Sequence, residues 1–226
     1  MWFSTSSEAM YPRWTTFVKT TLQPKVLETR NPKVWKTYLR ACMAPTQTKP
    51  AARAESLARE ALTQGPMVTI KAGLIRDPRE KDSFMCGSED LQPAFFAQNK
   101  SYSEIYINSW WATMFEECQG DLRAAKWTEC TLLHELIHWT RTRAGATAEI
   151  HLDEDEALKI GMSEAGQVFE MWAYGELQCT ASNVQTAKSA IASARIQAGW
   201  KQTLDWARQR QAAGVDPWRN NLRPVF

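Results

Sequence analysis

The sequence is poor in histidine and has almost no excess charge. Only 3 of its 226 residues are histidine, and 27 basic side chains nearly balance 25 acidic ones, for a formal net charge of +2. So small a charge excludes the strong electrostatic footprint of a nucleic-acid-binding domain or a membrane-surface patch. The apolar runs are also short, such as Phe95-Phe96-Ala97, and none approaches the length of a transmembrane helix. We therefore expect neither a nucleic-acid partner nor a membrane partner.

The N-terminal residues 1–8 have neither the basic n-region nor the apolar h-region of a conventional secretory signal. We expect secretion or delivery by a route that needs no such signal; a cytoplasmic location, or excision from a longer chain, is the alternative. The five cysteines also lack any C-x-x-C pair, and their number is odd. Buried thiols are the favoured reading, and one or two disulfides the alternative.

Hydrophobic periodicity predicts a predominantly helical α+β fold. Apolar spacings of three and four predict helices over 11–19, 24–41, 51–62, 121–143, 163–179 and 186–213. Alternation and β-forming residues predict strands over 67–75 and 103–108, with a loop over 76–93. We expect eleven tryptophans to build a large aromatic core, and the last helix to pack on it through Ile191, Ile196 and Trp200. The expected organisation is one compact unit with a helical N-terminal extension (1–66), a core (67–182) and a C-terminal helix (183–226).

Two of the three histidines fall in one motif, His134-Glu135-Leu136-Ile137-His138. On a helix, residues four apart are separated by about 40° and one turn, so both imidazoles can bind one metal ion. Glu135 lies about 100° from His134, beside the metal-bound water rather than on the metal. Zinc lowers the pKa of that water, and the glutamate would take the proton and pass it to the leaving amine. The motif therefore predicts zinc-dependent peptide hydrolysis; an incidental pair of helix histidines is the alternative.

A catalytic zinc needs a third protein ligand and one open position. The metzincin spacing is excluded, because positions 141 and 144 are Arg141 and Ala144 instead of glycine and histidine. We favour Glu170, because Gly166 one turn earlier would let two helices approach closely. Tyr174, one turn after Glu170, is either a donor to a developing oxyanion or a core tyrosine. The remaining candidates for the third ligand are Glu156, His151 and Asp153.

The HELIH motif followed by a glutamate on a second helix resembles the gluzincin class of zinc peptidases. Glu164-Ala165-Gly166, with Glu170 and Tyr174-Gly175, is similar to metallopeptidase domains of bacterial toxins and secretion-system effectors. This resemblance covers roughly residues 103–179. It implies a zincin-like core and one zinc ion, bound by His134, His138 and Glu170.

A more distant resemblance is to deuterolysin-like peptidases. It rests on the extended segment Ile105-Tyr106-Ile107 and on Thr131-Leu132-Leu133-His134-Glu135. The Gly-Thr-x-Asp segment of those enzymes is missing here.

We therefore expect a zinc endopeptidase that acts as a secreted effector or toxin on a protein or peptide substrate, with an inhibitor or immunity protein as a candidate partner. An extended peptide would add to the strand over 103–108 if that strand is an edge rather than an interior strand. The alternative is a zincin-fold binding module whose structural zinc is closed by Cys130 or His151 and which has no significant proteolysis. Glu135 argues against this alternative, because a structural site has no use for a carboxylate beside the metal.

Overall fold

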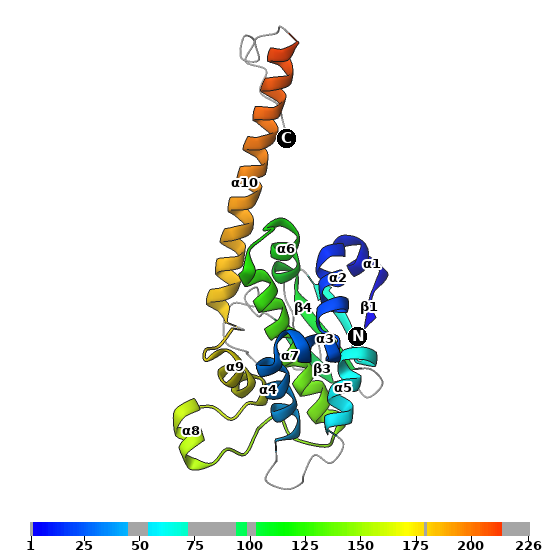
Figure 1. The fold of residues 1–226 in the computed structure, drawn as a ribbon, viewed down its shortest axis with the longest axis vertical. Helices are drawn as coiled ribbons and strands as arrows, with labels where there is room; N and C mark the ends of the chain where they lie inside the picture. The colour runs from blue at the N-terminus through cyan, green and yellow to red at the C-terminus, as the bar shows by residue number, and fades with distance from the viewer. Residues whose placement is uncertain (1, 45–53, 72–93, 99–102, 179, 214–226) are drawn as a thin grey trace, which may run out of the picture.

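Proline marks where three of the N-terminal helices begin. The computed structural model describes residues 2–44, 54–71, 94–98, 103–178 and 180–213 (Figure 1). A proline stands at the first position of α2, α3 and α4, where its missing N–H costs no hydrogen bond. The single helix predicted over 24–41 is therefore two helices, since Asn31 caps the second and Pro32 begins it. The N-terminal helices are α1 (Thr5–Met10), α2 (Pro12–Thr21), α3 (Pro24–Arg30), α4 (Pro32–Met43) and α5 (Ala54–Gln64).

Four strands form one mixed sheet in the order β1-β2-β4-β3. The strands are β1 (Trp2–Phe3), β2 (Met67–Lys71), β3 (Ala94–Gln98) and β4 (Ser103–Asn108). β1, β2 and β4 run parallel, and β3 is antiparallel to β4. The structure agrees with the prediction for β4 and for the start of the strand over 67–75; residues 72–75 and the predicted loop up to residue 93 lie outside the described residues. Because β4 pairs on both sides, it is an interior strand, and the idea that it offers an edge to a substrate is wrong.

The second half of the chain places a long helix between shorter ones. Its helices are α6 (Ser109–Glu117), α7 (Leu122–Arg143), α8 (Glu154–Ile160), α9 (Ala165–Tyr174) and α10 (Ala181–Ala212). Asp121 caps α7 by accepting a 2.9 Å hydrogen bond from the Arg123 N–H, close to the predicted start of the helix over 121–143. Gly145 follows the end of α7 with a φ of +73°. α9 is shorter than the predicted helix over 163–179, because Gly175 ends it in the left-handed conformation.

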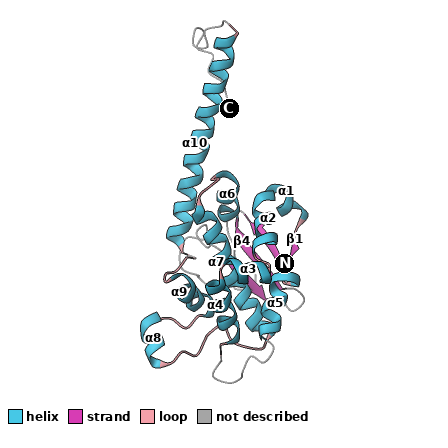
Figure 2. Cartoon of the chain, in the orientation of Figure 1, coloured by secondary structure: helices cyan, strands magenta, loops and turns pink. Residues whose placement is uncertain are grey.

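The helix α7 lies at the centre of the core. Its residues Leu132, Leu133, Leu136 and Ile137 are fully buried. One continuous hydrophobic cluster joins this helix to the N-terminal helices, the sheet and α9, through side chains that include Trp14, Trp35, Ile105, Trp111 and Phe169. The predicted predominantly helical α+β fold and aromatic core are confirmed (Figure 2). The three-segment division remains a prediction; residues of its first segment share this core with α7.

Among the described residues, the first half of α10 packs on the body of the molecule, where Arg195 also pairs with Glu117 of α6. Val184, Ala187 and Ile191 are buried, and α10 lies against α6 there. Its remaining turns project away from the body (Figure 1), so Ile196 and Trp200, predicted to be core residues, are instead 62% and 66% exposed. Within the described ranges, no helix combines the length and the apolar character needed to cross a membrane.

Three of the five cysteines lie in the described residues, and all three are thiols. Cys42 and Cys130 are buried, in agreement with the prediction, and Cys118 is partly exposed. Burial raises the pKa of the Cys42 thiol to about 12, although hydrogen bonds with Thr140 and Tyr38 oppose the shift. Cys86 and Cys179 lie outside the described residues.

Candidate metal centre

The two motif histidines lie side by side on α7. Their ring centroids are 5.1 Å apart, one turn along the helix. Both side chains are partly accessible, at 13% for His134 and 18% for His138, whereas the leucines between and before them are buried. The helix therefore turns its imidazoles toward an accessible face while its other faces pack in the core.

Glu164 completes a cluster of three metal-ligating groups with these histidines. One nitrogen of each ring and one carboxylate oxygen of Glu164 all lie within 4.8 Å of one another. Nε2 of His138 is 2.9 Å from Oε1 of Glu164, and Nε2 of His134 is 3.6 Å from Oε2. Two imidazoles and one carboxylate form a donor set that suits zinc, so the residues fit the metal that the motif implies.

The position of Glu164 follows from its place at the start of α9. Its carboxylate caps this helix by accepting hydrogen bonds from the backbone N–H groups of Gly166 at 2.7 Å and Gln167 at 2.8 Å. Burial raises the pKa of this carboxyl, but the hydrogen bond with His138, both histidine charges and the Gly166 N–H outweigh burial and lower the pKa to about 2. Glu164 is therefore an ionised carboxylate, held by backbone and directed at both rings.

Gly166 allows the start of α9 to touch the ring of His134. A Cβ added at this glycine would lie 2.4–2.5 Å from three ring atoms of His134, far inside any normal contact. The prediction that a missing side chain at Gly166 lets the two helices approach closely is confirmed.

Glu170, predicted as the third ligand, lies on the other side of the His134 ring. Its Oε1 is 2.6 Å from Nδ1 of His134, and its Oε2 accepts a 2.5 Å hydrogen bond from the backbone N–H of Gln178. The side chain is almost fully buried, at 1% exposure. The two carboxylates reach different sides of the ring because Glu170 lies six residues beyond Glu164, about 9 Å further along the axis of α9. Glu170 as the third ligand therefore stays a prediction, and its carboxylate contacts Nδ1 of His134, on the side of the ring away from Glu164.

Glu135 lies next to the cluster and is buried. Burial raises the pKa of its carboxyl, the two histidines lower it, and the carboxylates of Glu164 and Glu170 raise it further, so the net shift is upward. No hydrogen bond to this carboxylate comes from the residues that the structure describes. A carboxyl group with a raised pKa and no fixed partner is suited to exchanging a proton.

Tyr174 has a partner away from the cluster. Its hydroxyl donates a 3.1 Å hydrogen bond to Oε1 of Glu129, a buried carboxylate that also forms an ion pair with Arg30. Its ring packs edge-on against Phe169. These contacts are those of a core tyrosine with a satisfied hydroxyl, which is the alternative reading of its sequence position.

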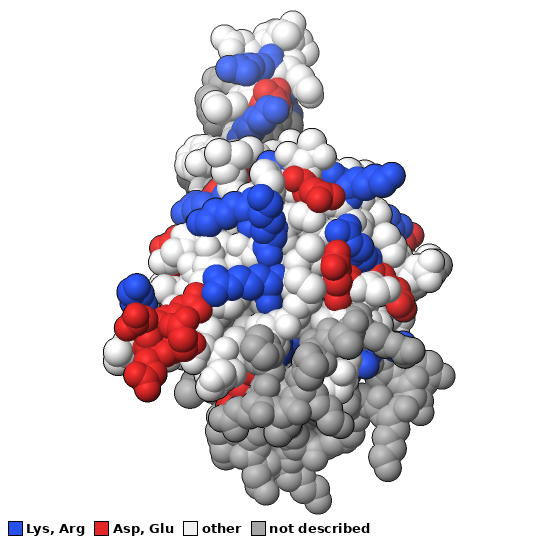
Figure 3. Space-filling view, turned by 60° about the horizontal axis from the view of Figure 1, so that its bottom comes forward, with Lys and Arg blue, Asp and Glu red and all other residues white. Residues whose placement is uncertain are grey.

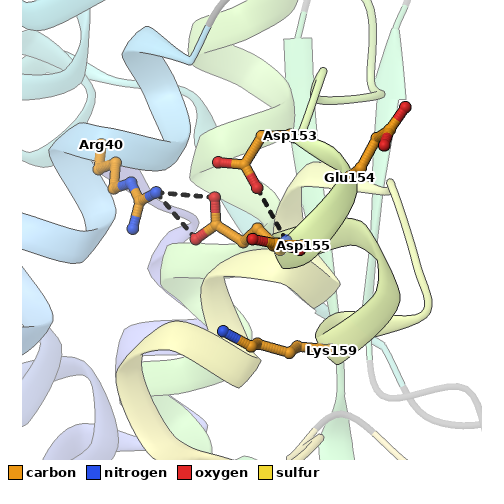
Figure 4. Close-up of a pocket in the computed structure, with 6 residues that line it drawn as sticks. Arg40, Asp153, Glu154, Asp155 and Lys159 are labelled. Carbon is orange, nitrogen blue, oxygen red and sulfur yellow. Dashed lines mark hydrogen bonds and ion pairs between the residues drawn. The ribbon is translucent and has the colours of Figure 1, made fainter.

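The rival ligands lie around α8. Glu156 accepts hydrogen bonds from Arg40 at 2.9 and 3.0 Å and from Nε1 of Trp172 at 2.9 Å, and Asp153 caps α8 (Figure 4). His151 is exposed. These acidic side chains form a patch over α8 at the left of Figure 3 and line a pocket of about 680 Å³ that contains neither motif histidine. The structure therefore gives these three residues other surroundings than the cluster.

Two imidazoles, a converging carboxylate and an adjacent glutamate on a helix packed against a small sheet are the arrangement of a metallopeptidase. The family model described as metallopeptidase toxin 3 matches residues 7–175, and the chain belongs to this family. No curated protein and no solved structure matches the chain. The protein is therefore a toxin-type metallopeptidase domain that requires a metal ion. The match begins at residue 7, so the N-terminal helices are part of the family domain, and it ends at residue 175, before α10.

Proposed function

We propose that the protein is a zinc-dependent endopeptidase whose metal is held by His134, His138 and Glu164. The observation behind this proposal is the convergence of these three groups within 4.8 Å, with Glu135 on the same helix as the two histidines. Among the described residues no fourth histidine, cysteine or carboxylate joins the cluster. A set of three protein ligands is typical of catalytic zinc, whereas structural zinc has four.

Zinc, when bound, supplies Lewis acidity and activates water for attack on the peptide carbonyl. Glu164, anchored by two backbone N–H groups, provides the anionic ligand. Glu135 accepts the proton of the attacking water at its carboxylate, holds it, and delivers it to the nitrogen of the leaving amine. Its buried position favours this role, because burial raises its pKa and so makes the carboxylate a stronger base.

Glu170 acts through His134 rather than on the metal. Its carboxylate, 2.6 Å from Nδ1, favours the tautomer with a proton on Nδ1 and leaves Nε2 with a lone pair for the metal. Its second oxygen is fixed by the backbone of Gln178, so the pair also sets the orientation of the ring. We therefore assign Glu170 to ligand orientation and leave Tyr174 out of the catalytic set.

The substrate we propose is an extended segment of a protein. Of the strands that the structure describes, β3 is the antiparallel edge strand, and it packs against α7. A peptide that pairs with the outer side of β3 would lie along the helix that carries the metal ligands. As a toxin, the enzyme would be delivered out of the producing cell, which would be protected by an immunity protein.

Metal analysis and one substitution test this proposal. The purified protein should bind about one zinc ion per chain, as a single site requires. Glu135→Gln should keep that zinc but lose cleavage of an unbiased peptide library, because glutamine fits the same space and cannot accept the proton. Cleavage at the wild-type rate by Glu135→Gln would disprove the assigned base, and absence of zinc after reconstitution would disprove the site.

A further inference from the structure

Arg141 is a fully buried cation on α7, one turn beyond His138. A guanidinium is rarely buried, because its removal from water is costly unless its N–H groups find acceptors. Its four hydrogen bonds within the described part of the chain all go to backbone carbonyl oxygens. The Arg141 side chain therefore connects other segments of backbone to α7, the helix that carries His134 and His138.

Those carbonyls belong to two different segments. Nη1 donates to the oxygens of Ala41 and Ala44 at the end of α4, each at 2.9 Å. Nε donates to Thr147 at 2.8 Å and Nη2 to Glu149 at 2.7 Å, in the segment that follows α7. The first pair of bonds fastens α4 to α7, whereas the second pair holds the chain that lies beside Glu164.

The segment around Glu149 pairs antiparallel with the segment that contains Glu164. Ile150 N–H donates to Ser163 O at 2.7 Å, and Ala165 N–H donates to Ala148 O at 2.8 Å, so these two bonds bracket the pair Glu149–Glu164. In a pair bracketed in this way, the central residues direct their own N–H and C=O away from the partner segment. The outward carbonyl of Glu149 is the one that Arg141 binds.

We propose that Arg141 is a positioning residue for the metal ligand Glu164. It fixes the backbone opposite Glu164 to the same helix that carries His134 and His138, and thereby sets the distance between the imidazoles and the carboxylate. This inference rests on the proposed zinc site. Electrostatics agree with the geometry: burial lowers the pKa of Arg141, and the charge of Glu164 is among the influences that raise it.

Arg141→Lys in the full chain tests this role. Lysine keeps the charge, but its single ammonium cannot reach carbonyls on both sides as the guanidinium does. We expect the zinc dissociation constant, measured by competition with a chelator, to rise on the order of 10-fold, as for other residues that support a metal ligand. Tyr38→Phe is the matched control, because it removes the hydrogen bonds of a buried α4 hydroxyl, among them the 3.1 Å bond to Ala58, and leaves the Glu164 segment untouched. It should change the thermal unfolding of the zinc-free protein but not its zinc affinity.

Ala165→Pro disrupts the pairing between the Glu149 segment and the Glu164 segment from the Glu164 side. It removes the N–H that donates to Ala148, while proline suits the first position of a helix. Zinc affinity should fall here too, and the double variant should lose less than the product of the two single losses, because both act through one pairing. If Arg141→Lys does not fold, the zinc affinity of Ala165→Pro alone tests the positioning role.

Wild-type zinc affinity in either folded variant, or losses that multiply in the double variant, would overturn the inference. A wild-type protein that binds zinc but cleaves no peptide would refute the proposed function and leave the positioning role supported by the affinities. A wild-type protein that binds no zinc would overturn both.

Discussion

Replacing Gly166 with alanine puts a methyl group where the ring of His134 lies. The added Cβ would be 2.4–2.5 Å from three ring atoms, whereas carbon atoms in normal contact are about 3.5 Å apart. Either the ring or the start of α9 must therefore move by roughly 1 Å. Both movements displace a proposed metal ligand, His134 in the first case and Glu164 in the second.

A displacement of about 1 Å at a catalytic group can cost on the order of 100-fold in rate. Overpacking typically costs about 1–3 kcal/mol of stability, and the better helix propensity of alanine offsets up to about 1 kcal/mol of that. We therefore expect Gly166→Ala to lower kcat/KM about 100-fold while the free energy of unfolding falls by only about 2 kcal/mol or less. Peptide hydrolysis and denaturant unfolding, measured on the same zinc-loaded samples, give the two numbers.

Gly199→Ala is the matched control, because Gly199 also lies in a helix but has open space where its Cβ would be. It should leave hydrolysis unchanged and stabilise the protein slightly, since alanine is the better helix former. Wild-type hydrolysis and zinc affinity in Gly166→Ala would show that the close approach of α9 to His134 has no role in the site.

Three further predictions follow from the contacts of single side chains. Glu170→Ala should weaken zinc binding by about 10- to 100-fold, as measured by chelator competition, because Nδ1 of His134 loses its carboxylate; unchanged affinity would remove the orienting role. Tyr174→Phe should retain hydrolysis within a few-fold and lose about 1 kcal/mol of stability, because its hydroxyl binds Glu129; loss of activity without loss of stability would return Tyr174 to the catalytic set. Cys42 should resist alkylation at pH 8 in the folded protein, because its thiol is buried and its pKa, raised to about 12, keeps it protonated at this pH. Peptide mapping that finds Cys42 labelled before unfolding would contradict this.

Half of the candidate site can be read from the sequence, because it lies on one turn of one helix. The spacing of His134, Glu135 and His138 determines their relative directions once α7 forms, and Asp121 signals where that helix begins. The third ligand depends instead on how the start of α9 meets α7, which is a tertiary relation. Gly166 signals the close approach, whereas our proposal of Glu164 at the cap of α9, in place of the predicted Glu170, rests on distances between the two helices.

The same distinction between local and distant contacts explains the fold. β4 was predictable from alternation within one segment, whereas β1 has two residues and is a strand only because it pairs with β2. The periodicity of α10 suggested a buried face at Ile196 and Trp200, yet within the described chain these residues project beyond the body of the domain. Hydrophobic periodicity predicts that a segment is helical, but it does not show which other part of the protein covers the apolar face of that helix.

An anomalous diffraction map of the zinc-loaded protein, recorded on both sides of the zinc edge, would locate the metal and its ligands directly. We expect one peak, at about 2.0–2.2 Å from Nε2 of His134, Nε2 of His138 and a carboxylate oxygen of Glu164, with Glu170 still against Nδ1 of His134. A peak bonded to Glu170 in place of Glu164, or no peak at the HELIH helix, would contradict this expectation.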